Sequence, residues 1–555
     1  MRGHARAWLV LAAALTALAA GSATRAQQAT ALPPIPSSAE LEAAGAVIGR
    51  ITVLPGNVFD PRIRGENTWL YTTADKLHVV TGVSVIRNQL LFKTGEPYVD
   101  RLLRETERIL RSNNYLYEAT VVPVAWDGHT VDLEVRTRDN WTLNPGIDYS
   151  HQGGASKGAV KLEEANLLGS GRALVFNWGK DVDRQSLTVR YTDPHLISTW
   201  TSLDVTYADA SDGHTRSLVI DRPFYALDTH HAGGGNLSET LQTDSRYVLG
   251  HVVGQFQQQH EYYEGYGGWS AGWRDGWVTR WTLGGTLQRD RFAELPDTVL
   301  GGPLPANREF VYPWLGYELI HDRYQEHVNQ DQMARIEDVL VGVHATARLG
   351  YAPTALGSDR AAFIVKAAVQ DGWDLRDDSK REPEESLFGS VQASGRLEDG
   401  AVRNGVLAAN LRYYLRTSAK TKFFASANGT VTDHLDQETQ LLLGGDTGLR
   451  GYPLRYQAGT SAALVTLEER YYTDWYPWRL FYVAGAVFYD MGRTWGTDVT
   501  GATSIGLLRD VGLGLRFASS RAAFGNVAHV DLAFPLDGDP SIKRVQFIIE
   551  TQLSF

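Results

Sequence analysis

Apolar and polar residues alternate along most of the chain from Trp141 to Phe555. Successive side chains of a β-strand point to opposite faces, so this period of two predicts strands with one apolar and one polar face. Clear stretches of alternation lie at residues 203–207, 407–415 and 545–555. The pattern is typical both of a sheet that covers a soluble core and of a barrel whose outer face contacts lipid.

Residues 47–140 have a mixed pattern that predicts a small α+β domain. The expected elements are a strand at 47–54, a short helix at 68–78, an extended segment at 83–92, a helix at 96–111 and two strands at 119–125 and 130–137. The second helix has apolar residues at 3.6-residue spacing on one face and arginines and glutamates on the other. Asp127-Gly128, between the last two strands, is a strong hairpin signal.

The first 26 residues have the layout of a secretory signal peptide. Two arginines precede an apolar run at residues 7–20, and the small residues Ala23 and Ala26 are candidate cleavage positions. A membrane anchor needs about 20 apolar residues, so cleavage is favoured over anchoring. A Pro-rich leader follows at residues 27–46, and the exported protein is expected to be either soluble or a β-barrel.

The length and the aromatic content of the C-terminal region favour the barrel. Residues 141–555 show no domain break, and at roughly 26 residues per strand with its loop they give about 16 strands, an even number as in bacterial outer-membrane barrels. The chain has 15 Trp, 25 Tyr and 18 Phe, and aromatics cluster at residues 471–478, where an interfacial girdle would place them. The predicted fold class is therefore mainly β: a transmembrane antiparallel barrel of about 16 strands over 141–555, preceded by the α+β domain.

The composition argues against several functions. Lys and Arg total 53 against 64 Asp and Glu, a net charge of −11, whereas a nucleic-acid-binding protein normally needs a basic face. The absence of cysteine excludes disulfides, thiolate nucleophiles and Cys-ligated metals. The 15 histidines form no recognised catalytic motif and no phosphate-binding loop is found. We therefore expect no enzyme activity, no cofactor and no metal site.

Four short motifs in the C-terminal region resemble those of one superfamily. They are, in chain order, EANLLGSG at 164–171, YTDP at 191–194, LRGY at 449–452 and AGAVFYDMG at 484–492, whose Phe488, Asp490 and Gly492 match a Phe-x-Asp-x-Gly pattern. Together they resemble the superfamily of outer-membrane barrels that contains BamA, TamA and the two-partner-secretion transporters. In the same resemblance, residues 47–140 are similar to a single POTRA domain. Phe547, Leu553 and Phe555 are similar to the aromatic C-terminal signal of such barrels.

The resemblance implies a lumenal loop motif made of Leu449, Arg450, Gly451 and Tyr452. In the superfamily the arginine of this loop meets the aspartate of the second motif on the inner wall, which would pair Arg450 with Asp490. A guanidinium in a partly dehydrated lumen needs such a carboxylate partner. Gly451 would permit a tight tip and Tyr452 would pack against the wall. Two roles for the arginine stay open: bracing the barrel and taking part in its gating.

The resemblance also implies a function, which is assembly of outer-membrane proteins or translocation of polypeptide. Substrate strands would pair with the seam between residues 141–150 and 545–555, because an open strand edge offers unpaired backbone groups. The alternatives are a two-partner-secretion transporter that exports a dedicated partner, and a passive porin-like channel. A single POTRA-like unit favours an accessory member of the superfamily.

The expected location is the outer membrane, with the N-terminal domain in the periplasm. The expected partners are the lipid bilayer and unfolded client polypeptide, with periplasmic chaperones or accessory subunits as further candidates. Neither nucleic acid nor nucleotide is expected as a partner.

Overall fold

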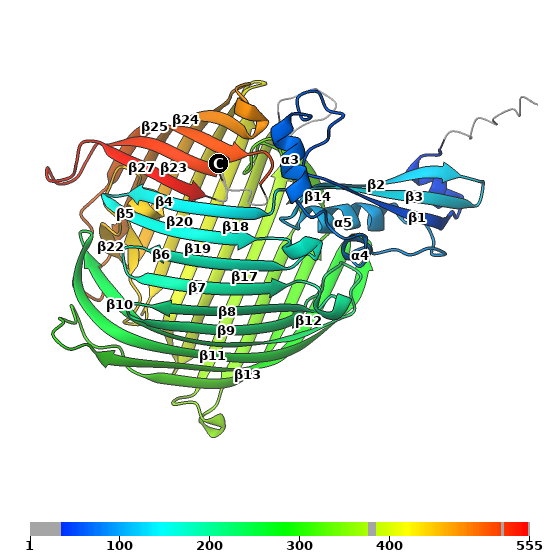
Figure 1. Ribbon diagram of the computed structural model, residues 1–555. Helices are drawn as coiled ribbons and strands as arrows, with labels where there is room; N and C mark the ends of the chain where they lie inside the picture. The colour runs from blue at the N-terminus through cyan, green and yellow to red at the C-terminus, as the bar shows by residue number, and fades with distance from the viewer. Residues whose placement is uncertain (1–34, 376–383, 523–526, 553–555) are drawn as a thin grey trace, which may run out of the picture. The chain divides into compact units, whose positions relative to one another are not determined.

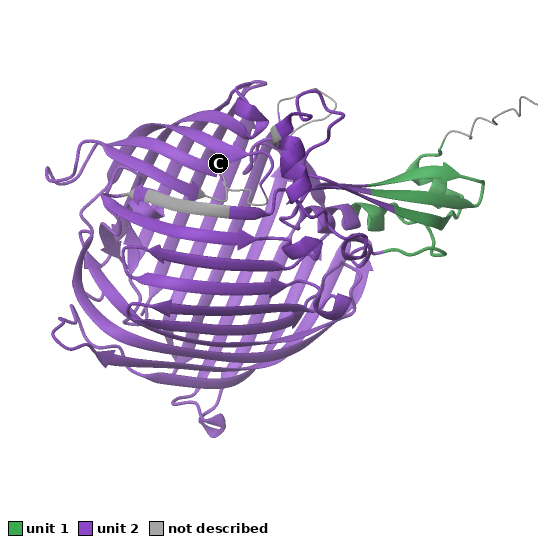
Figure 2. Cartoon of the chain, in the orientation of Figure 1, with its two compact units in different colours: residues 1–52, 92–104, 121–135 green, residues 53–91, 105–120, 136–555 purple. Residues whose placement is uncertain are grey.

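The computed structural model describes residues 35–375, 384–522 and 527–552. The chain forms two compact units (Figure 2). Unit 1 comprises residues 1–52, 92–104 and 121–135, and unit 2 comprises residues 53–91, 105–120 and 136–555. The predicted signal peptide at 1–26 and the first part of the predicted leader, residues 27–34, lie outside the described residues.

The N-terminal part of the chain contains short helices and a three-stranded sheet. Its elements are α2 (Ser38–Ala43), β1 (Val47–Gly56), α3 (Trp69–Leu77), α4 (Val83–Arg87), α5 (Asp100–Arg111), β2 (Leu116–Trp126) and β3 (Thr130–Asp139), and the sheet order is β1-β3-β2. One expectation was wrong. The segment expected to be extended from residue 83 begins with α4, whose Ile86 is fully buried. Within the predicted leader, α2 begins with a capping box formed by Ser37 and Glu40.

The C-terminal region is mainly β, as predicted. Its strands are β4 (Leu143–Gln152), β5 (Ala155–Glu164), β6 (Ala173–Lys180), β7 (Gln185–Asp193), β8 (Ser202–Ala210), β9 (Gly213–Arg222), β10 (His231–Val248), β11 (His251–Arg274), β12 (Trp277–Glu294), β13 (Arg308–His321), β16 (His344–Ala352), β17 (Ala362–Asp374), β18 (Glu385–Glu398), β19 (Ala401–Arg416), β20 (Thr421–Asp433), β23 (Ser461–Tyr472), β24 (Phe481–Trp495), β25 (Leu508–Ser519), β26 (Val527–Pro535) and β27 (Gln546–Gln552). Each strand pairs antiparallel with the next, and β27 lies beside β4, so the strand order closes into a ring (Figure 1).

The ring contains twenty strands within the described residues, not the expected 16 or so. The estimate of about 26 residues per strand was too large, because many connections are tight. Asp275 and Gly276 alone join β11 to β12, and Gly153 and Gly154 alone join β4 to β5. Tight turns shorten the repeat and leave room for more strands in the same length of chain.

The wall of the ring is apolar outside and charged inside. In β19, Leu407 and Leu411 are 51% and 45% exposed, whereas Tyr414, on the opposite face, is buried. In β25 and β26, by contrast, Arg516 and Asp531 are completely buried although both are charged. A soluble sheet would have the reverse arrangement, since apolar side chains leave water and charges remain in it. No helix in the described part of the chain is both long enough and apolar enough to cross a membrane.

Two long connections interrupt the ring, and they leave it at opposite ends. We call the end at which the chain enters β4 the base and the other end the rim. At the base, residues 322–343 join β13 to β16 and contain β14 (Tyr324–Val328) and β15 (Ile336–Leu340); we call them the inner hairpin. At the rim, residues 434–460 join β20 to β23 and contain β21 (Leu441–Leu443) and β22 (Gln457–Gly459); we call them the arginine loop.

Candidate functional site

The arginine loop has a paired neck and a buried tip. Its neck is the pairing of β21 with β22, in which Leu441 lies opposite Gly459. Its tip carries Leu449 and Tyr452, which are completely buried and pack with Leu443, Tyr456, Leu464 and Leu508 and, at the edge, Ile542. Leu464 and Leu508 belong to β23 and β25, so apolar contacts hold the tip against the inner wall. The loop therefore folds back into the ring instead of extending from the rim.

Arg450 is the charged centre of the tip. Its Nε and Nη2 donate to the two carboxylate oxygens of Asp490 on β24, at 2.7 and 3.0 Å. Its Nη1 donates to Glu468 on β23 at 3.1 Å, and its guanidinium carbon lies 3.4 Å from the ring centroid of Phe488. A bidentate carboxylate contact combined with stacking on an aromatic face uses the planar shape of a guanidinium fully, which a lysine would not.

The other motif residues shape the space around Arg450. A Cβ at Gly451 would lie 2.6 Å from the Cβ of Asp510, and a Cβ at Gly492 would lie 2.7 Å from Cδ2 of Leu443. A side chain at Gly451 would therefore require the loop or β25 to move, and one at Gly492 would require Leu443 to move. The hydroxyl of Tyr452 lies 2.7 Å from the carbonyl oxygen of Arg509 and accepts the backbone N–H of Asp537 at 3.2 Å. Phe488, Asp490 and Gly492, at alternate positions of β24, all face the loop.

The site also contains four charged residues that the motifs did not indicate. Glu468 accepts from Arg450 and from Arg470 on its own strand, the latter at 3.0 Å, and lies 3.5 Å from Arg516 on β25. Arg516 also pairs with Asp531 on β26. All four are buried, and buried charges persist only when they are paired. Their signal in the sequence is a charge at alternate positions of an otherwise apolar strand.

A second arginine of the same loop reaches across the rim. Arg455 donates two hydrogen bonds to Asp183, at 2.8 and 2.7 Å, and its guanidinium lies 4.3 Å from the ring centroid of Tyr247. Asp183 lies between β6 and β7, and Tyr247 is near the end of β10. The hydrogen bonds from Arg455 lower the pKa of Asp183 to about 2, against the opposing effect of burial. The loop is thus fixed on two sides of the ring.

The arginine loop also spans the seam between the first and the last strands of the ring. On the β26–β27 side, Tyr452 contacts Asp537. On the β4 side, Gly153 lies so close to the loop that a Cβ there would be 2.4 Å from the backbone nitrogen of Leu454. At the base, the N–H of Trp141 donates to the carbonyl of Arg521 at 2.6 Å.

Between these attachments the seam is weakly paired. Among the described residues, β4 and β27 share one register pair, His151 with Ile549. On its other side, β27 pairs residue by residue with β26 over 527–533. Of the predicted C-terminal signal, Phe547 lies on β27 and is 45% exposed, whereas Leu553 and Phe555 lie outside the described residues.

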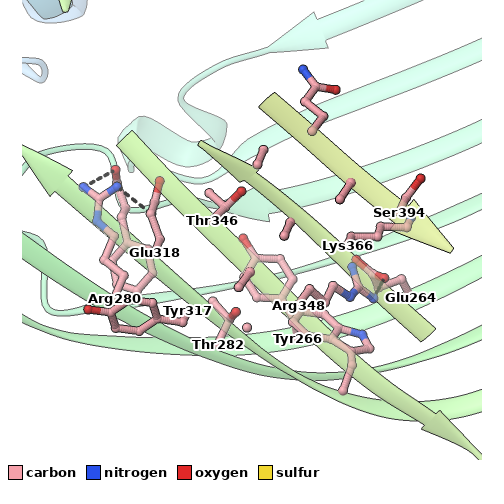
Figure 3. A pocket seen from close by; sticks show the side chains of 18 of the residues that line it. Glu264, Tyr266, Arg280, Thr282, Tyr317, Glu318, Thr346, Arg348, Lys366 and Ser394 are labelled. Atoms are coloured by element: carbon pink, nitrogen blue, oxygen red, sulfur yellow. Dashed lines mark hydrogen bonds and ion pairs between the residues drawn. The ribbon is translucent and has the colours of Figure 1, made fainter. Parts of the chain in front are cut away.

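The inner wall also bounds a cavity of about 760 Å³ (Figure 3). Arg280 of β12 donates to Glu318 of β13 at 3.0 Å, and Arg348 of β16 pairs with Glu264 of β11 and lies 3.5 Å from the ring centroid of Trp314. The remaining lining is mostly small or neutral, and includes Thr346, Ala367, Ala368, Gln392, Ser394 and Ala408. No group of three potential metal ligands occurs within the described ranges. The lining thus combines two ion pairs with small and aromatic side chains, among them Tyr266 and Tyr317.

Comparisons with known proteins gave matches in structure and none in sequence. No protein-family model matches the chain, and no curated protein matches its sequence. The structure is similar to BamA from Haemophilus ducreyi lacking POTRA domains 1–3, with 13% identity, coverage of 91% of this chain and 85% of that one, and a TM-score of 0.38. It is also similar to CdiB from Acinetobacter baumannii (12% identity, 92% and 74% coverage, TM-score 0.46) and CdiB from Escherichia coli (11%, 91% and 76%, TM-score 0.45). The function proposed below therefore rests on the contacts within this chain.

Proposed function

We propose that this chain is an outer-membrane β-barrel that inserts or translocates polypeptide, with the seam between β4 and β27 as the place where client strands pair. The observation that carries the proposal is the arginine loop, which contacts the turns on both sides of a seam whose described residues share one register pair. An edge with unpaired N–H and C=O groups accepts an added strand. A loop that holds both flanks of that edge is placed to control whether it opens.

The lipid environment follows from the wall itself. Apolar side chains such as Leu407 and Leu513 face outward and are about half exposed, while the charges lie inside. Burying those apolar side chains in hydrocarbon is favourable, at roughly 25 cal/mol per Å². Closure of the ring pairs the backbone groups of its strands with one another, as lipid requires, except along the seam, where the described residues of β4 and β27 share one register pair. The N-terminal sheet and helices would act in the periplasm as the POTRA-like unit, and the resemblance of the motifs supports that assignment.

Translocation through the lumen is favoured over a role confined to the seam by one observation, the cavity on the inner wall of β11–β19, whose lining combines two ion pairs with small and aromatic side chains. A dedicated secreted partner would use this route. A passive porin is disfavoured, because the arginine loop and the inner hairpin both occupy the interior of the ring.

The experiment is the substitution Arg450→Ala, compared with Arg493→Ala on the same strand as Asp490. Arg450→Ala should leave a heat-modifiable barrel in the membrane and lower the delivery of client proteins, measured by comparing outer-membrane and secreted proteomes. The Arg493 variant should behave like the parent. Unchanged client delivery in the Arg450 variant would show that the loop only stabilises the barrel, and it would overturn the proposed role in gating.

A further inference from the structure

The inner hairpin is unusually long for a connection at the base. It uses residues 322–343 where two residues, Asp275 and Gly276, suffice between β11 and β12. The connection begins and ends between neighbouring strands, β13 and β16, so closing that turn does not require its length. The additional residues instead make contacts elsewhere in the ring.

The tip of the inner hairpin crosses the interior to the other side of the ring. The carbonyl of Asn329 accepts from the hydroxyl of Tyr472 at 3.0 Å, and the carbonyl of Gln330 accepts from Arg470 at 2.8 Å. Met333 is buried among the inward side chains Ala484, Ala486, Ala518 and Val527 of β24, β25 and β26. A segment that leaves the ring at β13 and packs on β23–β26 lies across the lumen.

The middle of the tip is fixed to a third part of the wall. Asp331 accepts from the hydroxyl of Tyr414 at 2.7 Å and from Arg412 at 3.1 Å, both on β19. The side chains of Arg412 and Asp331 are 40% and 32% exposed. Water can therefore replace the contact with Arg412 at little cost, whereas the hydroxyl of Tyr414 is buried and would lose its partner. The contact with Arg412 differs in this respect from the buried network around Arg450.

The stem of the inner hairpin is held by helix α5. Arg111 donates to both carboxylate oxygens of Asp338, at 2.9 and 2.6 Å, and to Glu326 at 2.9 Å. The guanidinium of Arg108 lies 3.7 Å from the ring centroid of Tyr324. One residue of α5, Arg111, thus links both strands of the hairpin, β14 and β15, to the helix.

Two cavities lie one above the other along the same three strands, β17, β18 and β19. The upper is the cavity of Figure 3, which is lined by residues 366–368, 392–394, 406 and 408. The lower has a volume of about 740 Å³ and is lined by residues 370–371, 388–390, 410 and 412, which continue the same strands toward the base. Its other side is formed by the inner hairpin, from Asp331 to Leu340, and by Arg108 and Arg111.

We propose that the inner hairpin is a resident gate that closes a polypeptide conduit running along the inner face of β17–β19, and that release of Arg111 from Asp338 and Glu326 opens it. The inference rests on the proposed function for its cargo, an extended polypeptide. The lining suits such cargo: alanine, serine and glutamine side chains give no deep apolar pocket that would retain one kind of residue. In the open state, β14 and β15 would move away from β19 and β23–β26. This movement would connect the two cavities with each other and with the base of the ring.

The first test is electrical and needs no client. Purified full-length protein in planar bilayers should show small, brief openings. Replacing residues 322–343 with an Asn-Gly turn should give a steady conductance well above that of the parent, while replacing the rim connection 496–507 in the same way should not. A hairpin deletion that folds, as judged by heat modifiability, and conducts like the parent would overturn the gate.

The second test covers the case in which the deletion does not fold. The chain has no cysteine, so Met333→Cys gives a single thiol that is buried when the gate is closed, and Ile336→Cys gives an exposed control. Adding Arg111→Ala should raise the labelling rate of Cys at 333 by about tenfold, the change expected when charge-assisted hydrogen bonds are lost, and leave the control rate unchanged. Equal rates at 333 with and without Arg111 would overturn the link to α5. If the hairpin replacement raises the conductance, or Arg111→Ala raises the labelling rate, while client delivery stays at the level of the parent, the gate is supported and the proposed function is overturned.

Discussion

The arginine loop and the inner hairpin enter the same ring from opposite ends, but different chemistry holds each of them. The arginine loop is fixed by completely buried side chains, Leu449 and Tyr452, and by a network of buried charges around Arg450, whose own side chain is 11% exposed. The inner hairpin buries Met333 at its tip and Val341 beside β15. It otherwise relies on hydrogen bonds to its backbone, on the Arg111–Asp338 pair, which is 11% and 15% exposed, and on the more open Arg412–Asp331 pair.

The difference separates a permanent part of the fold from a movable one. Breaking a buried charge network leaves groups that neither water nor protein satisfies, and this is costly. Breaking partly exposed contacts costs little, since water replaces each lost partner. The loop at the rim is therefore expected to stay folded while the hairpin at the base exchanges between states, and the substitutions below test that contrast.

The largest effect is expected from Glu468→Ala. This carboxylate serves three guanidinium groups, those of Arg450, Arg470 and Arg516, and its removal leaves buried positive charges that face one another. We expect a loss of about 3–5 kcal/mol in the free energy of unfolding, measured by urea titration in lipid vesicles with tryptophan fluorescence. Glu469→Ala, on the opposite face of β23, is the matched control and should be nearly neutral. Equal losses in the two variants would contradict the buried network.

Gly451→Ala should have the next largest effect. Its Cβ would lie 2.6 Å from the Cβ of Asp510, so the tip of the loop must move or β25 must shift, and overpacking of this kind costs about 1–3 kcal/mol. The same unfolding titration measures it. Gly429→Ala, in β20, is the control because no atom lies within 4 Å of the added Cβ. A neutral Gly451→Ala would show that the tip is as loosely held as the hairpin.

The sequence predicted the loop better than the hairpin, for a physical reason. Arg450 belongs to the LRGY motif and Phe488, Asp490 and Gly492 to the second motif. The resemblance implied that these two motifs meet, and the structure brings the four residues together. The remaining charges of the network around Arg450 come from three strands that are brought side by side only by folding. They are Glu468, Arg470, Arg516 and Asp531. No short pattern can specify such a set.

The hairpin was invisible in the sequence for a different reason. Residues 322–343 contain no motif, and their contacts with the wall are of different kinds. Two backbone carbonyls accept from β23, Asp331 accepts from β19 and Met333 packs on β24–β26, and such isolated contacts form no short pattern in the sequence. The strand count was wrong for a related reason, since turn lengths depend on local geometry at each turn. Period-two alternation still placed the β-region correctly, because one residue in two must face each side whatever the number of strands.

A smaller effect is expected from Asp331→Ala, which removes the contact of the hairpin tip with Arg412 and Tyr414. The contact with Arg412 is partly exposed but the hydroxyl of Tyr414 is buried and loses its partner. The free energy of unfolding of the barrel should therefore fall by about 1 kcal/mol, while the labelling rate of Cys at 333 should rise. Asp331→Asn keeps an acceptor for Tyr414 and should give an intermediate rate. A loss of stability as large as that of Glu468→Ala would mean that the hairpin, too, is a fixed part of the fold.

The smallest effect concerns pH and the contact of Arg455 with Asp183. The pKa of this carboxyl is lowered to about 2 in the folded protein, below its ordinary value near 4. Its stabilising contribution is therefore complete above pH of about 4 and disappears as the pH falls through about 2. Hydrogen exchange of the Gly250 amide, which donates to the carbonyl of Arg455 at 3.2 Å, reports on this side of the loop. Asp183→Asn should exchange faster than the parent at neutral pH, and the two should converge near pH 2, where the parent carboxyl is protonated. A difference of the same size at both pH values would show that the loop is held at this point by packing on Tyr247 and not by the charge.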